Sequence, residues 1–218
     1  MIDKIISEKN YSVFLIISLF FSIALVHIFY LAVINPISFE ILAFAQDNNL
    51  PPPRHFAVVL KDPEQEICVI LFVWSLLIGI FKFYLVNNEH QLIDSGAYFK
   101  NGVNSLNEDS PQAYQFLDTF IENKFDTQQQ DLSFLKYISW AIPSIGFIGT
   151  VRGIGEALSR SAEAISGDIS KMTESLGIAF NSTFVALLIS IVLMLFITRL
   201  EHHQDEVIIK LRSKYLFK

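Results

Sequence analysis

Cysteine and charged residues are scarce in this 218-residue chain. The single cysteine, Cys68, excludes an internal disulfide framework and leaves no cysteine cluster for a zinc site. Charged residues make up 17% of the chain, whereas an ordinary soluble domain has about 25%. The hydrophobic content of 52% excludes a disordered chain, and the net charge of −6 argues against a nucleic-acid-binding surface. This composition indicates a membrane protein.

The sequence also lacks the motifs of the common enzyme classes. It contains no P-loop, no G-x-G-x-x-G, no G-x-S-x-G and no H-E-x-x-H. We interpret His202 and His203 as part of a solvated, charged tail, because we find no cysteine or carboxylate partner for them at metal-ligand spacing. We therefore expect a non-enzyme with no catalytic residue, no metal site and no cofactor.

Four apolar runs are candidates for membrane spans, which need roughly 20 residues. The first run is too long for the apolar region of a signal peptide, about 7–15 residues, so we expect it to remain as a helix. Lys82 lies near one end of the second run, where its amine can reach the membrane surface. The sequence predicts an all-α membrane protein with four transmembrane helices, at Tyr11–Ile34, Ile67–Val86, Tyr137–Leu158 and Ser175–Thr198.

Lysine and arginine are unequally divided between the two sides of these spans, which predicts their orientation. With the N-terminus in the cytoplasm, the outer segments carry only Arg54, Lys61, Arg160 and Lys171. The inner segments then carry Lys4, Lys9, Lys82, Lys100, Lys124, Lys136, Arg199, Lys210, Arg212, Lys214 and Lys218. We therefore expect both termini to be cytoplasmic.

The spans and their connections suggest three parts. Residues 1–86 form a transmembrane hairpin with an outer loop at 35–66, and residues 87–133 form an acidic cytoplasmic helical segment. Residues 134–218 hold the last two spans and a cytoplasmic tail. We expect helices three and four to be long and to continue into the cytoplasm.

Small and hydroxyl-bearing residues are concentrated in the last two spans. At helical spacing, one face of the third span carries Pro143, Gly146, Thr150, Gly153 and Ala157, and Gly149 and Gly153 form a small-xxx-small pair. One face of the fourth carries Ala179, Thr183, Ala186 and Ser190. Two interpretations remain open: close helix packing, or a narrow path in which hydroxyls coordinate water or a cation.

Three other residues of the third span also have two interpretations. Pro143 is either a simple kink or a functional hinge. Arg152 and Glu156 are spaced i,i+4, so they are either an ion pair at the membrane rim or charges at the mouth of an ion path. No span has an aspartate or glutamate near its centre. If the protein conducts ions, a partner chain must supply the carboxylate.

Residues 143–153, P-S-I-G-F-I-G-T-V-R-G, and residues 177–183, G-I-A-F-N-S-T, resemble two motifs of the MotA/TolQ/ExbB proton-channel family. The resemblance implies a homo-pentamer around two copies of a single-span partner of the MotB/TolR/ExbD type. In that arrangement the partner's aspartate carries H⁺ or Na⁺, and ion flow in the bacterial inner membrane drives rotation or mechanical work.

Carried over to this chain, the resemblance makes Thr150, Ser182 and Thr183 the lining of the ion path and Pro143 the hinge. Gly146, Gly149, Gly153, Ala179 and Ala186 would then allow close helix packing. Two alternatives remain: a four-helix membrane scaffold that only binds a partner, and a small transporter subunit in which Arg152 contacts an anionic substrate.

Overall fold

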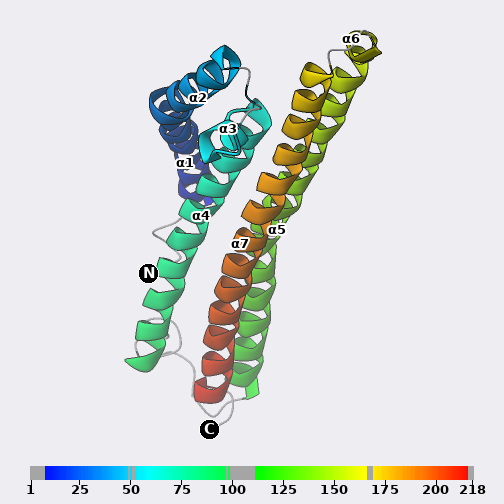
Figure 1. Cartoon of the computed structure of the whole chain (residues 1–218). Helices are drawn as coiled ribbons and strands as arrows, with labels where there is room; N and C mark the ends of the chain where they lie inside the picture. Colours follow the sequence, from blue (N-terminus) through cyan, green and yellow to red (C-terminus); the bar gives the residue numbers. More distant parts are fainter. Residues whose placement is uncertain are drawn as a thin grey trace. The chain divides into compact units, whose positions relative to one another are not determined.

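The computed structural model describes residues 8–48, 50, 53–96, 98, 111–165 and 169–215. Every regular element in these ranges is a helix, which confirms the all-helical class predicted from the sequence (Figure 1). The elements are α1 (Glu8–Phe29), the π-helical turn η1 (Tyr30–Ile34), α2 (Asn35–Asp47), α3 (Phe56–Leu60), α4 (Pro63–Asp94), α5 (Pro111–Ser159), α6 (Ser161–Ile165) and α7 (Ser170–Tyr215).

Four helical stretches of the described chain are long and apolar enough to cross a membrane, as the sequence predicts. They are Tyr11–Asp47, Pro63–Asp94, Tyr114–Ser159 and Met172–Tyr215. The helix α5 has 49 residues and α7 has 46. At 1.5 Å per residue each is roughly 70 Å long, more than twice the ~30 Å thickness of the hydrocarbon core. Both helices therefore extend well beyond a single membrane crossing.

The first span continues into a segment that we expected to be an outer loop. That expectation is wrong for 35–47 and 56–60, which are the helices α2 and α3. Pro36 lies in the first turn of α2, where a proline is compatible with a helix. In a regular α-helix, the Pro36 ring would crowd the carbonyl of Ala32. The wider π turn η1 lies directly before α2, and the Asn35 N–H bonds the Tyr30 carbonyl there.

The second span begins earlier than predicted, at Pro63 rather than at Ile67. Asp62 occupies the cap position, with proline at the first helical position, and its carbonyl accepts from the backbone N–H groups of Gln65 and Glu66. The first turn of α4 therefore carries Glu64, Gln65 and Glu66, which we had assigned to the outer loop. Pro51 and Pro52, which lie between α2 and α3 in the sequence, are outside the described residues.

The chain divides into two compact units, and the limits between the units fall inside α4, α5 and α7. The first unit comprises residues 1–76 and 138–193. In it, the buried residues Val26, Tyr30 and Ile34 pack against Leu60, Val69, Ile70 and Val73. The indole N–H of Trp74 on α4 also contacts the Leu15 carbonyl at 3.2 Å and the Ser18 hydroxyl at 3.1 Å on α1.

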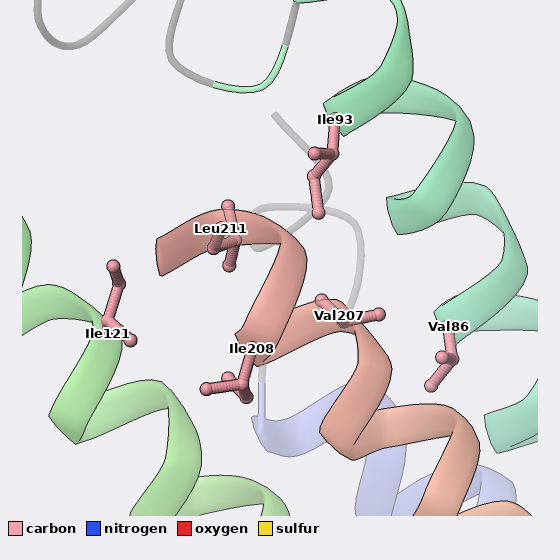
Figure 2. Packing of buried hydrophobic residues seen from close by; sticks show 6 residues of the cluster. All are labelled: Val86, Ile93, Ile121, Val207, Ile208 and Leu211. Atoms are coloured by element: carbon pink, nitrogen blue, oxygen red, sulfur yellow. The ribbon is translucent and has the colours of Figure 1, made fainter. Parts of the chain in front are cut away.

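The second unit comprises residues 77–137 and 194–218. Its core is a cluster of buried aliphatic side chains from α4, α5 and α7, namely Val86, Ile93, Ile121, Val207, Ile208 and Leu211 (Figure 2). Ion pairs join the same helices at 2.7–2.9 Å: Lys82 with Asp131, Lys124 with Glu89, and Lys136 with Glu201. Several charges of the acidic segment therefore pair across helices.

Candidate functional site

Three glycines of α5 face three small residues of α7 in the first unit. They pair in antiparallel order: Gly146 with Ala186, Gly149 with Ser182, and Gly153 with Ala179. A Cβ atom added at Gly149 would lie 2.7 Å from the Ser182 Cβ, and one added at Gly153 would lie 2.7 Å from the Ala179 Cβ. No side chain fits at those distances, so glycine is required for the two backbones to approach this closely.

Thr150 of α5 and Thr183 of α7 meet beside this glycine contact. Their hydroxyl groups are hydrogen-bonded to each other. The Thr150 hydroxyl also lies 3.0 Å from the Ala179 carbonyl and 3.3 Å from the Gly146 carbonyl. The Thr183 hydroxyl lies 3.2 Å from the Gly146 carbonyl. Two half-buried hydroxyls and two backbone carbonyls thus form a compact group of four oxygen atoms that carries no formal charge.

Ser182, the third predicted lining residue, has different partners. Its side chain is buried, and its hydroxyl donates to the Ile178 carbonyl at 3.3 Å within α7. It accepts a hydrogen bond of 3.2 Å from the Gln65 amide on α4. The structure therefore brings two of the three predicted hydroxyls together and joins the third to α4. Sequence analysis missed Gln65 because we placed it in the outer loop.

Pro143 lies inside α5, where it has no N–H to offer the carbonyl of Ser139 four residues earlier. The Ser190 hydroxyl of α7 donates to that carbonyl at 3.1 Å. A neighbouring helix therefore satisfies the backbone group that the proline leaves free, as membrane helices with internal prolines require.

The comparison with known protein families identifies this part of the chain. The sequence model of the MotA/TolQ/ExbB proton channel family matches residues 91–213, more than half of the chain. The chain belongs to the MotA/TolQ/ExbB proton channel family. No curated protein and no solved structure gives a significant match. This membership confirms the resemblance drawn from the two motifs. Together, the family and the four helices that can cross a membrane make the chain a multi-pass membrane protein of the channel and stator type.

The family match includes Pro143, Thr150 and Thr183, but it begins at residue 91, near the end of α4. Part of the candidate site therefore comes from outside the matched region. Arg152 of α5 pairs with Glu64 of α4 at 2.9 Å and not with Glu156, its neighbour at i+4. The Arg152 side chain is 40% exposed, whereas that of Glu64 is 11% exposed. The buried carboxylate is thus neutralised by an arginine that also reaches solvent.

Two more acidic residues lie beside this pair. Glu66 accepts from the His27 ring of α1 at 2.7 Å. Burial raises the pKa of the Asp62 carboxyl, with smaller opposing contributions from the charges of Lys61 and Arg152. One Asp62 carboxyl oxygen is buried without a hydrogen-bond partner in the part of the chain that the structure describes. Sequence analysis missed this group, although an Asp-Pro cap followed by two glutamates is a recognisable helix start.

Proposed function

We propose that five copies of this chain surround two copies of a single-span partner of the MotB/TolR/ExbD type in a bacterial inner membrane. Both termini of the chain face the cytoplasm. An aspartate of the partner carries H⁺ or Na⁺ past the chain, and ion flow turns one set of chains against the other. Family membership supports the channel and stator role, and the contact between Thr150 and Thr183 supports the assignment of the ion path.

The four oxygen atoms around Thr150 and Thr183 suit an ion that has lost part of its water. Hydroxyl and carbonyl oxygens replace hydration without holding the ion as tightly as a fixed carboxylate would. Each hydroxyl also has a carbonyl within reach, from Gly146 or Ala179. The hydroxyl of one threonine can therefore turn away from the other threonine and donate to the carboxylate of the single-span protein. It can return when that carboxylate has moved on.

Pro143 gives α5 a point of bending near this group. A proline removes one backbone hydrogen bond and weakens the helix locally. The Ser190 hydroxyl bonds the Ser139 carbonyl, so α5 is joined to the neighbouring helix α7 close to Pro143. Movement at Pro143 would change the position of Thr150, two turns further along α5, as the partner's aspartate gains or loses its charge.

The test is ion flux into vesicles that contain the chain together with a single-span partner of the MotB/TolR/ExbD type. Thr183→Val and Thr150→Val keep side-chain volume but remove the hydroxyl, and we expect each to abolish flux. Thr183→Ser keeps the hydroxyl and should retain flux. Ser144→Ala is the control, because in the described part of the chain the Ser144 hydroxyl bonds the Trp140 carbonyl of its own helix and no other helix.

Normal flux in Thr183→Val and Thr150→Val vesicles would refute the path through these residues. The mass of the complex should be measured for each variant, so that lost flux is not confused with lost assembly.

A further inference from the structure

Three side chains of the kind that binds metal ions converge in the second unit. They are His90 of α4, and His203 and Glu206 of α7, and one ligand atom from each lies within 4.8 Å of the others. The Nδ1 atom of His203 is 3.5 Å from a carboxylate oxygen of Glu206. The rings of His90 and His203 have centroids 4.7 Å apart. Sequence analysis treated His203 as a solvated residue, and the structure corrects this because its ring is half-buried against α4.

His90 has an unpartnered nitrogen in a buried position. The residue is 8% exposed, and its Nε2 atom is buried without a hydrogen-bond partner among the residues that the structure describes. The Nε2 atom of His203 is also buried without a partner among these residues, but its Nδ1 atom is the one that faces Glu206. A buried polar atom that makes no hydrogen bond is costly, and such atoms in a folded protein call for an explanation, which a bound ion can supply.

The two histidines are held by apolar neighbours. His90 lies four residues after Val86 and three before Ile93, and Val207 lies one turn after His203; these three aliphatic residues belong to the cluster in Figure 2. The Phe83 ring stacks on the His203 ring at a centroid distance of 4.6 Å. The Glu206 side chain is 60% exposed. The site is therefore rigid on the histidine side and open to solvent on the carboxylate side.

We propose that His90, His203 and Glu206 bind a divalent transition-metal ion of the zinc class. Imidazole nitrogens and a carboxylate oxygen are ligands that zinc accepts, and three protein ligands leave a fourth position for water. Bonds of about 2.0–2.2 Å place tetrahedral ligand atoms roughly 3.4 Å apart. The separation between His203 and Glu206 already suits this geometry, and small side-chain movements bring His90 into range.

The bound ion joins α4 to α7. Two of the ligands, His90 and His203, lie 113 residues apart in the chain and belong to different helices. The ion would add to the contacts that α4 and α7 already make through the aliphatic cluster and through Lys210 with Asp94. Metal binding therefore strengthens the second unit. This site does not depend on the ion path proposed above, because none of its residues belongs to that path.

Metal binding is tested on the full-length chain in detergent, stripped with EDTA and titrated with Zn²⁺. We expect one Zn²⁺ per chain, a higher unfolding temperature with Zn²⁺ than with Mg²⁺, and the absorption bands of tetrahedral coordination when Co²⁺ replaces Zn²⁺. His203→Ala and His90→Ala should each weaken Zn²⁺ binding at least tenfold, since even outer partners of a metal ligand are worth about 10–100-fold. His202→Ala is the matched control: this exposed neighbour should leave binding unchanged.

Wild-type protein that takes up no Zn²⁺ would overturn the proposal, and so would equal affinity in the His203→Ala and His202→Ala variants. If the histidine variants do not fold, Glu206→Gln tests the metal site instead, because a largely exposed side chain can be changed without disturbing the core. Weaker binding in Glu206→Gln supports the site, and unchanged binding in this variant refutes it.

Discussion

The Ser190 hydroxyl of α7 donates a 3.1 Å hydrogen bond to the Ser139 carbonyl of α5. This carbonyl is the one that an uninterrupted helix would bond to the N–H of residue 143, which is proline. Inside a membrane an unsatisfied carbonyl costs several kcal/mol. The bond therefore explains how an internal proline is accommodated in this long helix.

The Ser190 bond should matter only while residue 143 is proline. We expect Ser190→Ala to lower the free energy of unfolding by about 1–3 kcal/mol in the native chain, because the Ser139 carbonyl then loses its hydrogen-bond donor on α7. In a Pro143→Ala background the helix satisfies its own carbonyl, so the same change should cost close to nothing. Unfolding in detergent of the four proteins of this double-mutant cycle measures the difference. Equal losses in both backgrounds would show that Ser190 does not serve the proline.

The glycine contact between α5 and α7 predicts a sharp difference between two alanine substitutions. Gly149→Ala places a methyl group 2.7 Å from Ser182 and should destabilise the chain by about 1–3 kcal/mol through overpacking. Gly155→Ala meets no atom within 4 Å and should be neutral or stabilising by up to about 1 kcal/mol, because alanine favours helix. Thermal unfolding in detergent compares them. Similar melting temperatures for the two variants would contradict the close approach at Gly149.

The raised pKa of Asp62 predicts a pH-dependent contribution to stability. Folding favours the protonated carboxyl, so this contribution is present in full below the ordinary value of 3.8 and is lost as pH rises through the raised value. Asp62→Asn removes the titration and keeps a good helix cap. The variant should therefore gain stability over the native chain as pH rises from 4 to 7, measured by unfolding at both pH values. If the native chain and Asp62→Asn differ in free energy of unfolding by the same amount at pH 4 and pH 7, the burial of this carboxyl is contradicted.

The proposed assembly predicts a definite mass. A chain of 24.8 kDa that forms a homo-pentamer should give a complex of five such masses plus two copies of the partner. Native mass spectrometry of the complex extracted in detergent measures this directly. A complex with any other number of copies of this chain would contradict the pentamer, whereas a lone 24.8 kDa protomer would contradict assembly altogether.

Hydropathy alone predicted the spans because lipid imposes a simple requirement. A backbone in hydrocarbon must satisfy its own polar groups, so a long apolar run is a helix whatever it packs against. The contact between Thr150 and Thr183 could also be predicted from the sequence, because both residues lie on the small-residue faces of consecutive spans. The helices α2 and α3 were missed because short helices owe their stability to tertiary packing more than to their own sequence pattern.

The amino-acid sequence by itself determined the all-helical class, the four apolar spans and the family, since each depends on local runs or short motifs. Only the tertiary structure decided which side chains meet: Gln65 with Ser182, Arg152 with Glu64 and not Glu156, and His90 with His203. The partners in these pairs lie 88 to 117 residues apart in the chain. Helical periodicity says which face a residue occupies but not which helix covers that face, and packing settles that choice.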